Sequence, residues 1–235
     1  MAGLDRLLEA LEETAKLSGA RVENFLSIEA DIADLKQINK VPEKVMQHFG
    51  SVDGIINNAG IIQPFVKVND LSLDLMQRVM DVNFFGLVNV TKAFLPLLLE
   101  RPEAHIVNIS SMGGFLPVPG QSIYGASKAA VKLFTEGLYA ELKDTHVKVS
   151  TVFPGAIATN ITANSGVDMS GMEKKSSGMT SLPATDAAAI ILAGMEADRF
   201  HILVGSDSKF LYYLSRLAPE YATNFIAKKM KALLA

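Results

Sequence analysis

The stretch Asn108-Ile109-Ser110-Ser111 is followed by Tyr124-Gly125-Ala126-Ser127-Lys128. The tyrosine stands thirteen positions after the second serine (124 − 111 = 13). Tyr124 and Lys128 are four residues apart, so on a helix they lie on one face. An ammonium group beside a phenol favours the phenolate and lowers a pKa that is ordinarily about 10. Such a phenol can exchange a proton with an alcohol or carbonyl near neutral pH. With the Ser111 hydroxyl donating to the same substrate oxygen, the three residues suggest alcohol–carbonyl chemistry.

A tyrosine and a lysine at this spacing also occur on ordinary amphipathic helices, where the tyrosine packs and the lysine is solvated. The sequence around the stretch therefore decides between the two interpretations. Short apolar runs typical of strands alternate with amphipathic segments typical of helices. The expected strands are 25–30, 52–57, 105–109, 147–153 and 201–204, and the expected helices are 5–17, 42–49, 72–99, 123–144 and 185–197. Pro96 should end or kink the third of these helices.

This alternation predicts an α/β fold, a Rossmann-like doubly wound parallel sheet with about five strands and helices on both faces. In such sheets ligands bind beyond the carboxyl ends of the strands. Small or polar residues stand at four of those ends, namely Asp31, Asn58 to Gly60, Ser110 with Ser111, and Pro154 to Thr159. Packing alone explains four such ends poorly, so they predict a ligand site.

Each of these residues also has a purely structural interpretation. Asp31 would suit the N-cap of the next helix, and Asn57 with Asn58 would suit a strand end and a turn. Asn83, expected inside a helix, could satisfy a backbone carbonyl. Pro154-Gly155 forms a turn in either case, and Thr159 could be a solvated loop residue.

Length and composition fit a single domain over residues 1–235, of which 49% are apolar. The net charge is −3 and the pI about 5.8, without a basic stripe, which argues against nucleic acid as a partner. No apolar run approaches the roughly 20 residues of a membrane span, and the start lacks the pattern of a signal peptide. With no cysteine and four scattered histidines, no metal site is expected. These features predict a cytoplasmic protein.

Two segments differ from the rest. Residues 156–183 are rich in Ser, Thr, Gly and Met, which predicts a substrate loop with one helical turn. Its Met169, Met172 and Met179 could pack as a lid or line an apolar pocket. Residues 206–235 predict a helical tail interrupted by Pro219, and its apolar residues 210–213 suit a hydrophobic substrate or an interface.

The ordered motifs of this chain resemble those of the classical short-chain dehydrogenase/reductase family. They are Asn57-Asn58-Ala59-Gly60, Val82-Asn83-Phe84-Phe85-Gly86, Asn108-Ile109-Ser110-Ser111, Tyr124-Gly125-Ala126-Ser127-Lys128 and Pro154-Gly155-Ala156-Ile157-Ala158-Thr159. The resemblance covers about residues 1–205. It implies oxidation or reduction of a small alcohol or carbonyl compound with NAD or NADP, in a homodimer or homotetramer.

The resemblance also implies roles for individual residues. Tyr124 would be the general acid/base, Lys128 would lower its pKa and bind the nicotinamide ribose, and Ser111 would hold the substrate oxygen, with Ser110 a bystander. Asn83 would hold a water that links Lys128 to solvent. The implied cofactor contacts are Asp31 at the adenine, Asn58, Ala59 and Gly60 along the adenosine, and Pro154, Gly155, Ile157 and Thr159 at the nicotinamide.

The chain departs from the family pattern at its start. The family begins with a strand, a glycine-rich turn and a helix that bind the cofactor pyrophosphate, and no such glycine-rich motif occurs here. Residue 1 is expected to fall just before the helix that follows the family's second strand. The fold is thus expected to be N-terminally truncated, leaving the strand at 52–57 with an unpaired edge. Either the strand at 25–30 pairs with it directly, or another chain covers it.

This departure keeps a second function open beside the oxidoreductase, that of a non-catalytic binding or assembly protein built on the same fold. A hydrolase with Ser111 as nucleophile is a third interpretation. It needs a histidine base in reach and a strained nucleophile turn, and the sequence around Ser111 favours neither.

Overall fold

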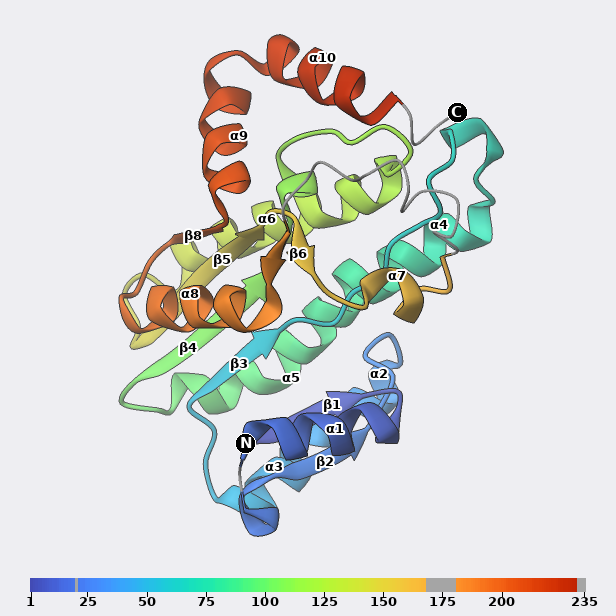
Figure 1. The fold of residues 1–235 in the computed structure, drawn as a ribbon. Helices are drawn as coiled ribbons and strands as arrows, with labels where there is room; N and C mark the ends of the chain where they lie inside the picture. Colours follow the sequence, from blue (N-terminus) through green and yellow to red (C-terminus); the bar gives the residue numbers. More distant parts are fainter. Residues whose placement is uncertain (20, 168–180, 232–235) are drawn as a thin grey trace.

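A computed structural model describes residues 1–19, 21–167 and 181–231 (Figure 1). Four parallel strands form the main sheet in the order β3 (Gly54–Asn57), β4 (Ala104–Ile109), β5 (Val147–Pro154) and β8 (His201–Val204). Two further parallel strands, β1 (Ala2–Asp5) and β2 (Leu26–Glu29), form a separate sheet. The predicted α/β Rossmann-like fold with parallel strands is confirmed.

Helices surround these strands, and most lie where the sequence predicts them. The longer ones are α1 (Leu8–Ser18), α3 (Val41–Phe49), α4 (Leu73–Met80), α5 (Leu87–Leu99), α6 (Ser122–Glu141), α8 (Ala184–Glu196), α9 (Ser206–Leu217) and α10 (Pro219–Met230). The short ones are α2 (Leu35–Ile38), α7 (Ile161–Asn164) and the 3₁₀ turns η1 (Val22–Asn24), η2 (Val68–Asp70) and η4 (Met112–Gly114). A two-residue pair, β6 (Ile157–Ala158) with β7 (Leu182–Pro183), closes the set.

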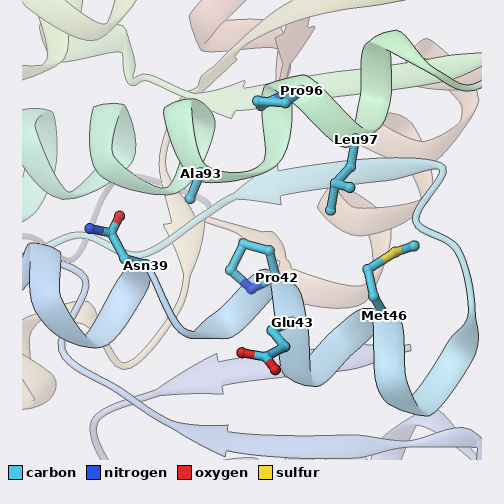
Figure 2. A pocket seen from close by; sticks show the side chains of 7 residues that line it. All are labelled: Asn39, Pro42, Glu43, Met46, Ala93, Pro96 and Leu97. Carbon is cyan, nitrogen blue, oxygen red and sulfur yellow. The ribbon is translucent and has the colours of Figure 1, made fainter.

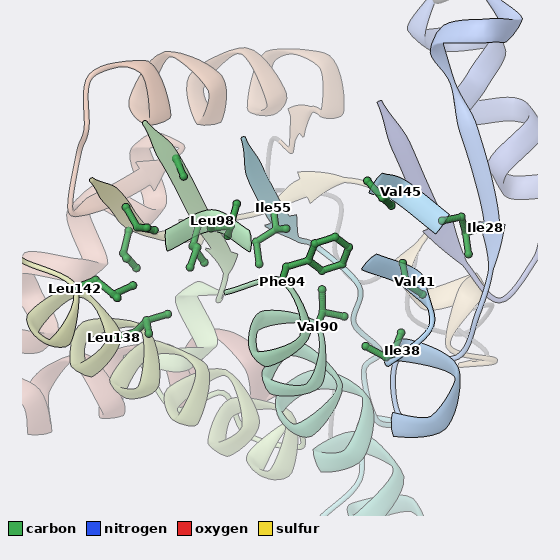
Figure 3. Packing of buried hydrophobic residues seen from close by; sticks show 14 of the residues in the cluster. Ile28, Ile38, Val41, Val45, Ile55, Val90, Phe94, Leu98, Leu138 and Leu142 are labelled. Atoms are coloured by element: carbon green, nitrogen blue, oxygen red, sulfur yellow. The ribbon is translucent and has the colours of Figure 1, made fainter. Parts of the chain in front are cut away.

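Strand β4 is buried on both faces because its side chains alternate between two apolar clusters. In β4, Ala104 and Ile106 point into the cluster made with α3, α5 and α6, whose labelled members include Phe94 and Leu138 (Figure 3). Val107 and Ile109 point the other way, into the cluster made with α8. This double cover explains why every residue of β4 is buried.

The start of the chain differs from the expected elements. Residues 2–4 were left without an element and Asp5 was expected to begin a helix, but together they form β1. Strand β1, helix α1 and strand β2 make a parallel β-α-β unit. Gly3 permits this packing, because a Cβ there would lie 2.9 Å from the Phe25 ring. A four-residue strand that contains glycine gives little sequence signal.

The predicted direct pairing of the strand at 25–30 with the strand at 52–57 is therefore wrong. β2 pairs with β1, and neither is hydrogen-bonded to β3. The two sheets share one apolar cluster, in which Ile28 and Ala30 meet Ile55 through α3 and α5 (Figure 3). The alternative, that another chain covers the edge of β3, stays a prediction.

The segment from Leu73 to Leu99 is one continuous helical run of 27 residues, and an 18-residue stretch within it has mean hydropathy 1.6. It is long and apolar enough to cross a membrane by length and composition alone, but Val79, Val90 and Leu98 are buried against the rest of the protein. The run continues through Pro96, so the expectation that Pro96 ends it is wrong. Pro96 lacks the N–H that would donate to the Lys92 carbonyl, so the helix continues past it with one hydrogen bond fewer in the preceding turn.

A hollow of about 370 Å³ lies between α3 and α5 (Figure 2). Pro42 and Met46 line it from α3, and Ala93 and Leu97 line it from α5 (Figure 2). It belongs to the helical layer that joins the two sheets and contains none of the predicted site residues.

Candidate active site

Ser111, Tyr124 and Lys128 meet just beyond the carboxyl end of β4. Ser111 follows that strand, and its hydroxyl hydrogen-bonds the phenol of Tyr124, which lies in the first turn of α6. Lys128 lies one turn further along α6, and its Nζ donates to the Ile109 carbonyl oxygen at 3.0 Å. Gly113 contacts both partners, since a Cβ there would lie 3.4 Å from the Tyr124 ring and 3.6 Å from Ser111 Oγ. The structure thus brings together the three residues that the spacing selected.

The protonation of this group differs from the sequence expectation. Burial raises the pKa of Tyr124, while the hydrogen bond from Ser111 acts in the opposite direction and is the smaller effect. Burial also lowers the pKa of Lys128 to about 8. The expected lowering of the Tyr124 pKa is therefore wrong for the protein by itself, because the phenol is removed from water. At neutral pH the phenol carries its proton.

Ser110 has a structural contact, in line with its expected role as a bystander. It is buried, and its Oγ donates to the backbone carbonyl of Lys128 at 2.7 Å. Gly114 makes room for this contact, because a Cβ there would lie 2.6 Å from Ser110 Oγ. The first serine thus fastens α6 to β4, and the second faces the phenol.

Asn83 lies in η3 (Asp81–Gly86), a π-helical turn between α4 and α5, and is fully buried. Its Oδ1 accepts the Ile61 N–H at 2.8 Å, and its Nδ2 donates to the Ile61 carbonyl at 2.9 Å and to Ser127 Oγ at 2.9 Å. Such π-turns are often found at functional sites. In this structure the Asn83 amide fastens the segment after β3 to the helix that carries Tyr124 and Lys128.

Gln63 is a site residue that sequence reasoning missed. Its Oε1 accepts the N–H groups of Ile123 and Tyr124 at 3.0 Å each, and its Nε2 donates to the Gly120 carbonyl at 2.9 Å. The side chain thus caps the first turn of α6, where backbone N–H groups have no partner within the helix. No local sequence pattern indicates this role of Gln63. In the structure Gln121, which precedes α6, makes no side-chain cap.

A buried polar chain supports the strands beneath the site. Asn57 Nδ2 donates to Thr91 Oγ1 at 3.1 Å and to Asn108 Oδ1 at 2.8 Å, and Asn108 Nδ2 donates to Thr135 Oγ1 at 3.0 Å. The chain links β3 and β4 to α5 and α6. Asn57 therefore supports the sheet, as its structural interpretation proposed.

Comparison with known proteins agrees with this geometry. The sequence profile of the short chain dehydrogenase family matches residues 1–170. The chain belongs to this family.

Two curated relatives of this short-chain dehydrogenase extend the comparison. A protein named putative oxidoreductase SadH from Mycobacterium tuberculosis is 35% identical over 216 residues, covering 89% of this chain and 78% of the relative. A 1-deoxy-11-beta-hydroxypentalenate dehydrogenase from Streptomyces exfoliatus is 31% identical over 207 residues, covering 86% and 72%. Their names place the chain among dehydrogenases and oxidoreductases, which are enzymes.

Solved structures show the same fold. A short-chain dehydrogenase/reductase from Burkholderia phymatum in complex with NAD has a TM-score of 0.80 at 25% identity, covering 92% of this chain and 85% of that one. A short chain dehydrogenase from Burkholderia cenocepacia in complex with NADP has a TM-score of 0.76 at 24% identity, covering 96% of each. These neighbours support a nicotinamide dinucleotide as the cofactor type of the family.

In this short-chain dehydrogenase, Asp31 follows β2 and does not cap the next helix. Asp34 is the N-cap, since its carboxylate accepts the N–H groups of Lys36 and Gln37. Asp31 Oδ1 accepts the Ala33 N–H at 3.0 Å, and its Oδ2 lies 3.9 Å from Nε of Arg6. Arg6 directly follows β1, so the sequence analysis, which missed that strand, also missed this cation.

The turn after β5 is held by the end of β8 and the segment that follows it. Gly155 N–H donates to the Val204 carbonyl at 2.9 Å, Ala156 N–H donates to Asp207 Oδ2 at 2.8 Å, and Ser208 Oγ donates to the Phe153 carbonyl at 2.7 Å. A Cβ at Gly155 would overlap the Asp207 carboxylate, so the turn after Pro154 requires glycine. Ile157 in β6 is half-buried, and Thr159 is exposed.

The residues present fit the nucleoside parts of a nicotinamide dinucleotide. A Cβ at Gly60 would lie 3.1 Å from Lys128 Nζ and 3.3 Å from Asn83 Oδ1, so glycine leaves room there for a ligand to approach both groups. Asn58 and Ala59 are exposed beside it at the end of β3. The link between β1 and α1, Arg6-Leu7, contains no glycine.

The predicted substrate loop approaches the site from the side of β3. Its described part contains a helical turn, α7, as predicted, and Ser165 Oγ accepts the Ile62 N–H at 3.0 Å. Met169, Met172 and Met179 lie outside the described residues. The helical tail approaches from the other side, where Leu211 and Ile226 pack on Leu116, five residues after Ser111.

The structure gives no support to a hydrolase. Over residues 1–19, 21–167 and 181–231, the side-chain partners of Ser111 are Gly113 and Tyr124, and no histidine is among them. His105 hydrogen-bonds Ser150, and His201 hydrogen-bonds Glu136 and Tyr212.

Proposed function

We propose that this chain is an NAD(P)-dependent oxidoreductase that interconverts an alcohol and a carbonyl compound. The observation that carries the proposal is the placement of the Ser111 hydroxyl and the Tyr124 ring together around Gly113, with Lys128 on the next turn of α6. A substrate oxygen placed between the two hydroxyls would accept hydrogen bonds from both. Such paired donors stabilise negative charge that develops on that oxygen.

In the direction of reduction, Tyr124 donates its proton to the carbonyl oxygen as the carbonyl carbon gains a hydride. A bound reduced nicotinamide supplies that hydride. Ser111 steadies the oxygen, and the Lys128 ammonium stabilises the phenolate left on Tyr124. Because burial raises the pKa of Tyr124, the free protein holds the proton that this direction requires.

Several further assignments belong to the same proposal. Asp31, Asn58, Ala59 and Gly60 would line the adenosine side, and Pro154, Gly155, Ile157 and Thr159 would line the nicotinamide side. Asn83 would position the loop at Gly60 and could hold a water beside Lys128. The single domain comprises residues 1–235, with 156–183 as substrate loop and 206–235 as helical tail.

We also propose a cytoplasmic homodimer or homotetramer. The oligomer is supported by exposed apolar residues on the helices beside the site, with Phe85 at 49% and Leu133 at 70% exposure. Large exposed apolar patches commonly mark protein interfaces. The substrate class, a small hydrophobic alcohol or carbonyl, is supported by the apolar cluster beside Ser111.

Calorimetry with NADH and NADPH tests the proposal before any substrate is known. Saturable binding that is weakened by Lys128→Met supports it, with Lys132→Met on the same helix as the matched control. If neither dinucleotide binds the folded protein, the alternative of a non-catalytic binding or assembly protein gains the support that it lacks now.

A further inference from the structure

Helix α9 exposes an apolar face on the side turned away from the protein. Phe210, Tyr213 and Leu217 are 58%, 60% and 85% exposed, and their spacing of three and four residues places them on one face. The opposite face carries the buried Leu211 and Tyr212. The apolar cluster with Leu116 thus fixes the helix and leaves the outer face without a partner among the described residues.

Helix α10 continues this surface with aromatic and basic side chains. Tyr221 is exposed and stacks on Phe225, with ring centroids 6.4 Å apart, and the Lys229 ammonium lies 5.1 Å from the Phe225 ring centroid. Lys228 and Lys231 are exposed. Both helices stand together at one end of the molecule, where α9 leaves β8 and α10 turns across it (Figure 1).

The charge of these helices is opposite to that of the rest of the protein. Residues 206–231 contain five basic residues, Lys209, Arg216, Lys228, Lys229 and Lys231, and two acidic ones, Asp207 and Glu220, for a net charge of 5 − 2 = +3. The whole chain carries −3, so the remainder carries −3 − 3 = −6. Positive charge is therefore concentrated at the end that exposes the apolar face.

We propose that α9 and α10 form a docking surface for an anionic lipid bilayer. Exposed aromatic and aliphatic residues flanked by lysine and arginine are typical of helices that lie in the membrane interface. Basic residues near such a surface are attracted to anionic headgroups. A second copy that presented the same basic surface would repel this one, so charge complementarity favours lipid over a symmetric contact between two copies.

Co-flotation of the full chain with vesicles tests the proposal without any assay of activity. We expect binding to vesicles of phosphatidylcholine mixed with phosphatidylserine, little binding to phosphatidylcholine alone, and release as salt is raised. Replacing Lys228 and Lys231 by Gln should weaken binding about fivefold for each lysine removed. Phe210→Ser with Leu217→Ser should weaken it on the same vesicles.

Matched controls distinguish the effect of this surface from the effects of losing any exposed lysine or any exposed apolar residue. Lys143→Gln with Lys148→Gln removes two exposed lysines elsewhere, and Leu17→Ser removes an exposed leucine on α1. Both controls should bind as the parent does. Absent binding overturns the proposal, and so does binding that the controls weaken as much as the substitutions on α9 and α10 do. If the substitutions on α9 and α10 change the mass of the protein in solution and no lipid binding is found, the proposal is also overturned, in favour of an interface between copies.

Discussion

Gln63 accepts the backbone N–H of Tyr124 through its Oε1 at 3.0 Å, although 61 residues separate the two in the sequence. The same oxygen accepts the Ile123 N–H, and the Gln63 side chain is completely buried. The N-terminus of the helix that carries the proposed acid/base residue is thus capped by a side chain from the loop after β3. The position of the Tyr124 phenol depends on that loop as well as on α6.

Gln63→Ala should destabilise the fold, because two N–H groups at the start of α6 lose their shared acceptor. The expected cost is about 1–3 kcal/mol in the free energy of unfolding, as for buried donors left without a partner. Urea unfolding measures it. Gln47→Ala, which removes an exposed glutamine on α3, is the matched control and should change stability by less than about 0.5 kcal/mol. Equal effects of the two substitutions would contradict a capping role for Gln63.

Lys128 should give the protein a characteristic dependence of stability on pH. Its pKa is lowered from 10.5 in the unfolded chain to about 8 in the fold, so between these values the unfolded state binds the extra proton. Stability should therefore rise as pH increases from about 8 towards 10.5, and the penalty is fully present below 8. Tyr124 opposes this only above its ordinary value of 10.0, because its raised pKa makes the folded state hold its proton longer.

Denaturant unfolding of the parent and of Lys128→Met at a series of pH values checks this dependence. The difference in stability between the two should shrink steadily above pH 8, with the variant relatively more stable at lower pH. A difference that does not change with pH would show that Lys128 is not desolvated in the fold.

Gly155 and Asp207 should be energetically coupled. Gly155→Ala places a methyl group against the Asp207 carboxylate and should cost about 1–3 kcal/mol. Asp207→Ala removes the acceptor of the Ala156 N–H and should itself destabilise the fold. In the double variant the clash is gone, so the two costs should sum to more than the measured total. Strict additivity in a double-mutant cycle would mean that the two residues do not meet.

Arg6 should favour NADPH over NADH if the adenosine lies over Asp31 as proposed. An arginine at the end of the strand beside that carboxylate suits a 2′-phosphate. Arg6→Gln should weaken NADPH binding and leave NADH binding nearly unchanged, as measured by calorimetry. Arg21→Gln, at an exposed arginine whose neighbour is Glu23, is the control. A parallel loss for both dinucleotides would place Arg6 outside the 2′-phosphate site.

The sequence predicted the order of the α/β elements and the grouping of Ser111, Tyr124 and Lys128, because periodicity and local spacing determine both. It did not predict β1, whose four residues include the glycine that lets Phe25 pack. Contacts made across long separations, such as Gln63 with Tyr124 and Asp207 with Ala156, leave no local pattern. The direction of the Tyr124 pKa was mistaken because burial, which raises this pKa, is known only from the fold.

The most direct test follows the absorbance of reduced nicotinamide while the full chain acts on a panel of aldehydes and ketones, for the parent, Tyr124→Phe and Tyr139→Phe. Tyr139 lies on the same helix, is 40% exposed and serves as the matched control. We expect turnover by the parent and the control, and a loss of about 10²-fold or more in Tyr124→Phe, the usual contribution of a general acid. Turnover that survives unchanged in Tyr124→Phe would contradict proton transfer by this phenol.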